Sequence, residues 1–174
     1  MQIYTGDGKG KTTAAFGLAL RAAGQGNKVL IYQFLKPPPV DTGERFALQL
    51  GAVRIRVETL DQRWDMDESF KDEQALVRMR AAISDAVERI AQTAEKRFYD
   101  VLILDEIVFC LSKGLADIAQ IKHVIDRRDP RVEIVMTGRG ASQELKEMAD
   151  LVTEMKCVKH PFDKGVAARR GIEF

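Results

Sequence analysis

The chain has 174 residues, 45% of them hydrophobic and 30% charged, which suits a single compact domain and leaves no room for a second full one. Its 27 Lys and Arg residues nearly balance 26 Asp and Glu residues, and this net charge of +1 argues against nucleic acid as the main partner. No apolar run approaches the ~20 residues that span a bilayer, and the polar N-terminus is no signal peptide, so we expect a cytoplasmic protein. The two cysteines, Cys110 and Cys157, lie far apart in sequence and are predicted to be buried thiols.

The N-terminal half alternates between β-rich runs and helical patterns. Residues 2–4 (QIY) and 28–34 (KVLIYQF) are predicted strands, and the helical stretch between them is predicted to end at a Gly24 C-cap. Residues 52–58 (AVRIRVE) alternate apolar side chains with arginines, which predicts a strand near the sheet edge. Apolar residues at spacings of three and four then predict a long helix from 73 to 98 that covers the sheet.

The C-terminal half continues the alternation. Strands are predicted at 101–105 (VLILD), 132–138 (VEIVMTG) and 151–158 (LVTEMKCV). One helix is predicted around residues 115–125, and another begins at 142 with Ser142 as its N-cap. The regular order predicts an α/β fold with a mainly parallel sheet and helices on both faces, formed as one domain over residues 1–174.

One interruption and one motif point to the site. The Pro-rich stretch KPPPVDTGER at 36–45 is predicted to be an active-site loop, because it is short and both flanks belong to the alternating pattern. The stretch TGDGKGKTTAAFG at 5–17 predicts a phosphate-binding loop that runs into a helix. Its glycines let successive N–H groups turn toward an anion at a helix N-terminus. The standard pattern has Gly at the position of Thr5, but strand, loop and helix follow in the order of a P-loop NTPase-like (RecA-like) fold.

Four polar side chains are predicted to form a nucleotide and metal site. Lys11 is expected to contact the outer phosphates, and the Thr12 hydroxyl is expected to coordinate Mg²⁺. The stretch VLILDE places Asp105 and Glu106 at the carboxyl end of a buried strand, where a cation held by Thr12 needs carboxylates. A carboxylate at a strand end can also merely cap a helix. The prediction of a metal site therefore depends on these carboxylates occurring together with the phosphate-binding loop.

The residues alone leave the reaction open between a kinase or ATPase, a nucleotide switch and another kind of transferase. Phosphoryl transfer needs a group that acts on the γ-phosphate, and an arginine could supply it. The arginines available are Arg45, Arg63, Arg127, Arg128, Arg139, Arg169 and Arg170. Solvated surface arginine is the default interpretation for most of them, and His123 and His160 are expected to be structural.

Four stretches together resemble the ATP:corrinoid adenosyltransferases, the P-loop branch of the cob(I)alamin adenosyltransferases. They are the loop with the helix and strand that follow it, VLILDEI, TGRGASQELKEMADLVTEM and the closing VKHPFDKGVAARRGIEF. The resemblance extends from Met1 to Phe174 and is weakest between about 38 and 98. It implies that cobalt(I) of a reduced corrinoid attacks the 5′ carbon of ATP and that triphosphate departs. The alternative is a P-loop kinase or ATPase that cleaves the γ-phosphate.

The resemblance also implies the site residues. Nucleotide contacts are expected at Gly6, Asp7, Gly8, Lys9, Gly10, Lys11, Thr12 and Thr13. Catalytic roles are expected for Lys11, Thr12 and Glu106, and metal contacts for Thr12 and Glu106, with Asp105 the weaker candidate.

Two further positions match the family's corrinoid side. Arg139 lies in the TGRG block and is expected to contact a phosphate or a corrin side chain, although a surface arginine in a tight turn is the alternative. Trp64 matches a tryptophan beside the corrinoid, whereas Gln62 replaces an expected aromatic residue, so Trp64 as ordinary core stays an open alternative. ATP, Mg²⁺, a corrinoid substrate, an external flavoprotein or flavodoxin-like reductant and a homodimer complete what the resemblance implies.

Overall fold

Six parallel strands form one sheet in this structure, a computed structural model that describes residues 1–36, 43–49, 54–62, 64–65 and 68–172. The strands are β1 (Gln2–Thr5), β2 (Val29–Gln33), β3 (Ile55–Thr59), β4 (Val101–Asp105), β5 (Glu133–Thr137) and β6 (Leu151–Glu154). Their order across the sheet is β3-β2-β4-β5-β1-β6, and every neighbouring pair is parallel. The carboxyl ends of all six strands therefore lie at one edge of the sheet, where ligands bind in such folds.

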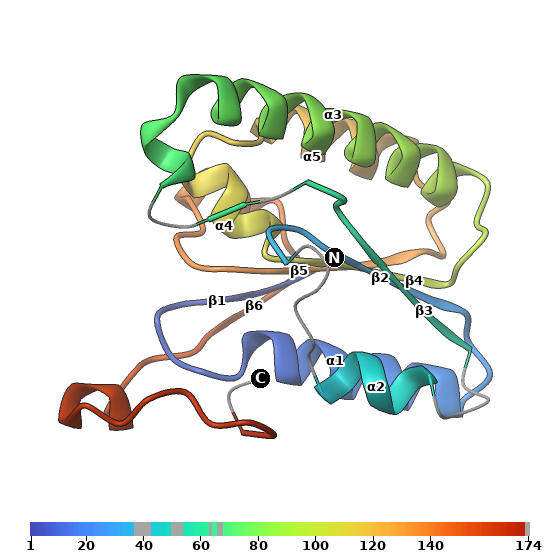
Figure 1. Cartoon of the computed structure of the whole chain (residues 1–174). Coiled ribbons are helices and arrows are strands. Elements are labelled where there is room, and N and C mark those ends of the chain that lie inside the picture. The colour runs from blue at the N-terminus through green and yellow to red at the C-terminus, as the bar shows by residue number, and fades with distance from the viewer. Residues whose placement is uncertain (37–42, 50–53, 63, 66–67, 173–174) are drawn as a thin grey trace.

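Helices cover both faces of the sheet (Figure 1). Helices α1 (Lys11–Gly24) and α2 (Gly43–Gln49) lie on one face, and α3 (Glu73–Glu95), α4 (Ile107–Ser112) and α5 (Ile118–Arg127) lie on the other. The remaining helical elements are α6 (Gln143–Glu147) and the short 3₁₀ turns η1 (Ser69–Lys71) and η2 (Pro161–Lys164). This architecture confirms the predicted α/β, P-loop NTPase-like fold.

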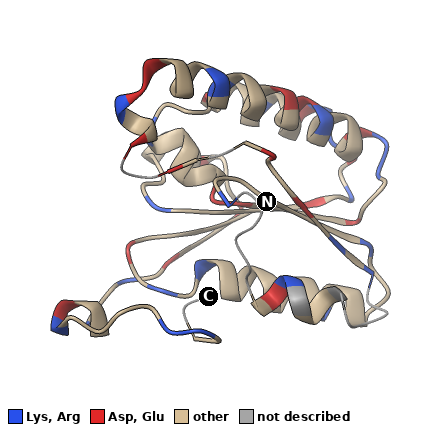
Figure 2. Cartoon of the chain, in the orientation of Figure 1, with Lys and Arg blue, Asp and Glu red and all other residues tan. Residues whose placement is uncertain are grey.

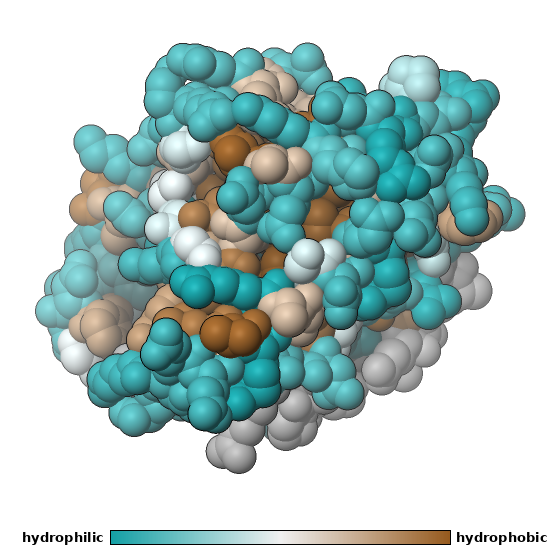
Figure 3. Space-filling view, turned by 90° about the horizontal axis from the view of Figure 1, so that it is seen from above, coloured by the Kyte–Doolittle hydropathy of each residue, from teal (hydrophilic) through white to brown (hydrophobic). Residues whose placement is uncertain are grey.

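Alternation along the strands divides the core into two layers. In β2, Leu30 and Tyr32 pack in the layer under α3, whereas Val29 and Ile31 pack against α1. Adjacent side chains of a strand point to opposite faces, and because both faces are covered, all five β2 residues are buried. Helix α3 buries one apolar stripe, while its other face carries both signs of charge (Figure 2). The surface seen from above is accordingly mostly hydrophilic, with apolar patches between (Figure 3).

Most predicted elements are confirmed, and the differences occur at their ends. The strand predicted to reach residue 158 stops at Glu154, because β6 pairs with β1, and β1 turns into the phosphate-binding loop after Thr5. The long helix ends at Glu95 rather than at Phe98, whose side chain is exposed. Gly24 is the last residue of α1 and not its cap, which is Gln25.

Other expectations were wrong, incomplete or lie outside the described residues. Helix α4 was not predicted, since its six residues are too few for a helical period to be recognised. Part of the predicted loop at 36–45 lies outside the described residues, and α2 begins within it at Gly43. Cys110 is buried as predicted, but Cys157 is exposed because it follows β6 at the edge of the sheet.

Within the described ranges, no helix combines the length and apolar character needed to cross a membrane.

Candidate active site

The phosphate-binding loop connects β1 to α1 at the carboxyl edge of the sheet. The N–H of Gly8 donates to the carbonyl of Met155 over 2.7 Å, and a Cβ at Gly8 would lie 2.7 Å from the same oxygen. The loop therefore fits against the segment after β6 because position 8 has no side chain. At its outer side, Lys9 Nζ donates to the carbonyl of Ile172 over 2.7 Å. The C-terminal segment thus supports the loop from two sides.

Lys11 points into the loop from the first turn of α1. Its ammonium is buried and donates to the carbonyls of Gly6 and Gly8 over 2.7 and 2.8 Å. Burial lowers the pKa of Lys11, and the positive charge of Arg139 lowers it further. A bound phosphate would offset this desolvation, so the ammonium is placed to exchange carbonyl partners for phosphate oxygens.

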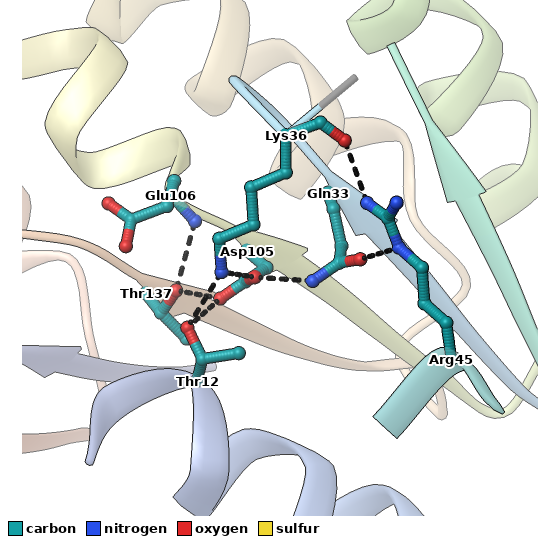
Figure 4. Close-up of polar contacts among 7 residues, drawn as sticks. All are labelled: Thr12, Gln33, Lys36, Arg45, Asp105, Glu106 and Thr137. Carbon is teal, nitrogen blue, oxygen red and sulfur yellow. Dashed lines mark hydrogen bonds and ion pairs between the residues drawn. The ribbon is translucent and has the colours of Figure 1, made fainter. Parts of the chain in front are cut away.

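Asp105 is the centre of a polar network at the end of β4 (Figure 4). Its Oδ1 accepts hydrogen bonds from Thr12 Oγ1 over 2.9 Å and from Thr137 Oγ1 over 2.7 Å. Its Oδ2 accepts from Gln33 Nε2 over 3.0 Å and from Lys36 Nζ over 2.9 Å. The carboxylate is fully buried, yet four donors satisfy it, from α1, from β5 and from the end of β2 with the residues that follow it.

The network keeps Asp105 ionised. Burial by itself raises the pKa of this carboxyl, but the charge of Lys36 and the hydrogen bonds from Thr137 and Gln33 outweigh burial, and the pKa lies below its ordinary 3.8. A depressed carboxyl pKa stabilises the fold above its ordinary value, and the contribution is lost as the pH falls through the lowered pKa. The network therefore contributes to stability at neutral pH and fails in acid.

The adjacent carboxylate, Glu106, has the opposite electrostatic environment. Burial raises its pKa, and the negative charge of Asp105 raises it further. Glu106 adopts a left-handed backbone conformation with φ 69°, and its N–H donates to Thr137 Oγ1 over 2.9 Å. Its carboxylate points away from Asp105 in Figure 4, and none of the described residues donates a hydrogen bond to it. Strained backbone with an unpartnered, partly buried charge is typical of a functional site.

Oxygen donors at this edge of the sheet fit a hard divalent cation such as Mg²⁺. Thr12 and Glu106 are the side chains that would hold it, since a cation would stabilise the ionised form of Glu106, which burial and the charge of Asp105 disfavour. Asp105 is already occupied by four donors and would act by orienting the Thr12 hydroxyl. Across the described part of the chain, no three His, Cys, Asp or Glu side chains converge as a protein-only metal cage.

Comparison with known proteins identifies the family. The chain matches the family ATP:corrinoid adenosyltransferase BtuR/CobO/CobP over residues 1–174. This chain belongs to that family. It is 34% identical over 172 residues to the corrinoid adenosyltransferase of Escherichia coli (strain K12), covering 99% of this chain and 84% of the relative. The corrinoid adenosyltransferase CobA of Salmonella typhimurium (strain LT2) is 32% identical with the same coverage. That of Sinorhizobium sp is 34% identical over 174 residues, covering 99% of this chain and 78% of the relative.

The TGRG block brings Arg139 to the site of this adenosyltransferase family member. Arg139 is exposed and follows Thr137 of the network by two residues, and its charge lowers the pKa of both Lys11 and Glu106. Gly138 before it has φ 139°, and a Cβ there would lie 2.5 Å from the backbone nitrogen of Phe109 in α4. A glycine is therefore required for the block to pass α4 and present the arginine.

Trp64 belongs to the hydrophobic core. Its side chain is 9% exposed and packs edge-on against Phe70 in the core layer under α3, with ring centroids 4.9 Å apart. The structure thus places Trp64 in the core, the alternative that the sequence left open. Gln62 is partly buried, and Arg63 lies outside the described residues.

Three residues of the network were missed in the sequence: Gln33, Lys36 and Thr137. Gln33 and Thr137 end the buried strands β2 and β5, where a polar residue after an apolar run is the signal that could have identified them. Lys36 follows β2 in the stretch assigned to an active-site loop. Arg45 was named among the arginines, and it donates from α2 to the Gln33 side chain over 2.7 Å. His160 is the N-cap of η2, where its Nδ1 accepts from the N–H of Phe162.

Proposed function

We propose that this chain transfers the 5′-deoxyadenosyl group of ATP to cobalt(I) of a reduced corrinoid and releases triphosphate. The observation that carries the proposal is the assembly of Lys11, Thr12 and Glu106 at the phosphate-binding loop, in a chain that belongs to this family along its whole length. The expected nucleotide contacts at residues 6–13 belong to the same proposal.

The reaction balances without a protein acid or base. The cobalt(I) electron pair forms the cobalt–carbon bond while the bond from the 5′ carbon to the triphosphate oxygen breaks, and the triphosphate keeps that bonding pair. No proton moves in this step, so the protein's task is to bind ATP, orient its 5′ carbon toward the corrinoid and stabilise the departing charge.

Lys11 and the loop N–H groups would bind the triphosphate, so that the negative charge developing on the leaving group meets fixed donors. Mg²⁺ held by Thr12 and Glu106 would neutralise further phosphate charge. The exposed Arg139 would contact either a phosphate or a corrin side chain. These roles direct the ribose outward, toward a corrinoid at the same edge of the sheet.

The remaining parts of the proposal concern partners and organisation. An external flavoprotein or flavodoxin-like reductant would reduce the corrinoid cobalt to cobalt(I). The two cysteines do not form a redox pair that could supply these electrons, because one thiol is buried and the other is exposed. A homodimer in the cytoplasm is proposed, supported by exposed Leu151 and Val152 on the edge strand β6. Pairing of β1 with β6, from the two ends of the chain, supports a single domain over residues 1–174.

An anaerobic assay tests the reaction. Purified protein is mixed with Mg²⁺, ATP and chemically reduced cobalamin, the corrin spectrum is followed, and the phosphate product is identified. We expect a light-sensitive adenosylcobalamin spectrum together with inorganic triphosphate. ADP with an unchanged corrin spectrum would replace the proposal with a kinase or ATPase, and binding without turnover at one equivalent of corrinoid would indicate a nucleotide switch.

Matched lysine variants make the assay specific for the loop. Lys11→Ala should abolish turnover and keep the circular dichroism spectrum of the folded protein, because its ammonium contacts loop carbonyls rather than the core. Lys122→Ala removes an exposed lysine of α5 that pairs with Glu144, and it should retain activity. Retained turnover in Lys11→Ala would refute the phosphate role of this residue.

A further inference from the structure

Lys36 occupies the position between the two oxygens expected near the metal. Its Nζ lies 3.2 Å from Thr12 Oγ1 and 2.9 Å from Asp105 Oδ2, and Figure 4 shows the side chain reaching across the site to both. A lysine ammonium is a compact positive charge. The protein itself therefore supplies a positive charge at this position.

The backbone fixes Lys36 in this place. Leu35, the residue before it, has φ 57°, a left-handed conformation that is costly for a branched side chain. Arg45 of α2 donates from Nη2 to the carbonyl of Lys36 over 2.7 Å and from Nε to Gln33 over 2.7 Å. One arginine thus positions both residues that bond to Asp105 Oδ2. Lys36 is part of a built arrangement and differs from a mobile surface lysine.

The buried negative charge of Asp105 explains why a cation must lie where the Lys36 ammonium is. Asp105 is fully buried, and Lys36 is the ion-pair partner that the described residues provide for it. A buried carboxylate that loses its partner is strongly destabilised. Mg²⁺ beside Thr12 and Glu106 would, in turn, lie next to the Lys36 ammonium, and the two like charges would repel each other. The lysine and the metal therefore compete for one region of the site.

We propose that Lys36 is an internal counter-ion that holds the cation position while the nucleotide site is empty and gives it up when Mg²⁺ arrives with ATP. This inference rests on the Mg²⁺ site of the proposed function. Its consequence is that the metal binds poorly by itself, since it must displace a paired lysine. Triphosphate makes the exchange favourable, because its negative charge gives the displaced ammonium a new partner.

Metal binding without nucleotide tests this inference. Thermal unfolding and calorimetric titration with MgCl₂ are measured for the wild type, Lys36→Met and the control Lys122→Met, at constant ionic strength and without ATP or corrinoid. Lys122 also forms a lysine–carboxylate pair, 2.7 Å from Glu144, but an exposed one. We expect Lys36→Met to melt lower than the wild type, to regain stability with Mg²⁺ and to bind Mg²⁺ about tenfold more tightly, a typical coupling factor. Wild type and Lys122→Met should respond weakly and equally.

The inference is overturned if Mg²⁺ stabilises the wild type and Lys36→Met equally. It is also overturned if Lys36→Met is as stable as the wild type and insensitive to the metal. If Lys36→Met can be purified only with Mg²⁺, the inference is supported. If Mg²⁺ does not rescue it, the inference fails. Lys36→Arg keeps the charge and should behave as the wild type. These measurements contain neither ATP nor corrinoid. Their outcome can therefore be interpreted even if the adenosyl-transfer assay fails.

Discussion

Replacing Gly8 by alanine tests whether the loop is shaped by the segment after β6. The added Cβ would lie 2.7 Å from the carbonyl oxygen of Met155 and 2.9 Å from the backbone of Lys156. Both neighbours are backbone atoms, so the segment itself has to move. The same movement breaks the hydrogen bond from the Gly8 N–H to Met155, which is 2.7 Å long.

The expected loss follows from these contacts. Overpacking against backbone costs about 1–3 kcal/mol, and a lost hydrogen bond costs about 1 kcal/mol. The lower entropy of an alanine in the unfolded chain returns about 0.4–1 kcal/mol. A net loss of about 2 kcal/mol remains, and it should lower the melting temperature by about 4–8 °C in a chain of this size.

Gly17→Ala is the matched control for thermal unfolding followed by circular dichroism. Gly17 is exposed in α1, with no atom within 4 Å of an added Cβ. Alanine there should raise stability by about 0.5–1 kcal/mol, since glycine weakens a helix interior. The reasoning is refuted if Gly8→Ala melts at or above the temperature of the wild type.

Three further predictions concern the carboxylate, the thiols and the tryptophan. Glu106→Gln should raise the melting temperature of the metal-free protein at pH 7, because the raised pKa of Glu106 means that its ionised form destabilises the fold. The gain should appear as the pH rises above the ordinary value of 4.5 and vanish below it, and a gain that grows toward acid would contradict this sign. Ellman's reagent should modify exposed Cys157 in the folded protein and buried Cys110 after denaturation, since burial raises the pKa of the Cys110 thiol; two reactive thiols in the folded state would be inconsistent with the structure. Trp64→Ala should lower the free energy of unfolding in urea by about 3–5 kcal/mol, because it empties a core position beside Phe70. Unchanged stability together with a slower reaction of cobalamin alone would instead place Trp64 at the corrinoid.

Local patterns were sufficient for most of the elements and for part of the site, although the short helices α2 and α4 were not predicted. The central strands are short apolar runs, β3 alternates apolar and charged residues, and the apolar spacing of α3 is that of a helix packed on one face. Periodicity alone therefore predicts these elements. The phosphate-binding loop and the carboxylates after β4 could be recognised because their chemistry requires adjacent residues. Lys11, Thr12 and Glu106 were therefore named from the sequence.

The tertiary structure decided which distant residues join them. Residues Gln33, Lys36 and Thr137 meet at Asp105 because the strand order places β2 and β5 on either side of β4. No local pattern fixes the order of these three central strands, since β2, β4 and β5 are each buried on both faces. The sequence by itself determined the strands, the long helices, the loop and the adjacent carboxylates. The arrangement of the strands decided that a lysine from another segment neutralises the buried carboxylate, because such a contact depends on distance in space rather than along the chain.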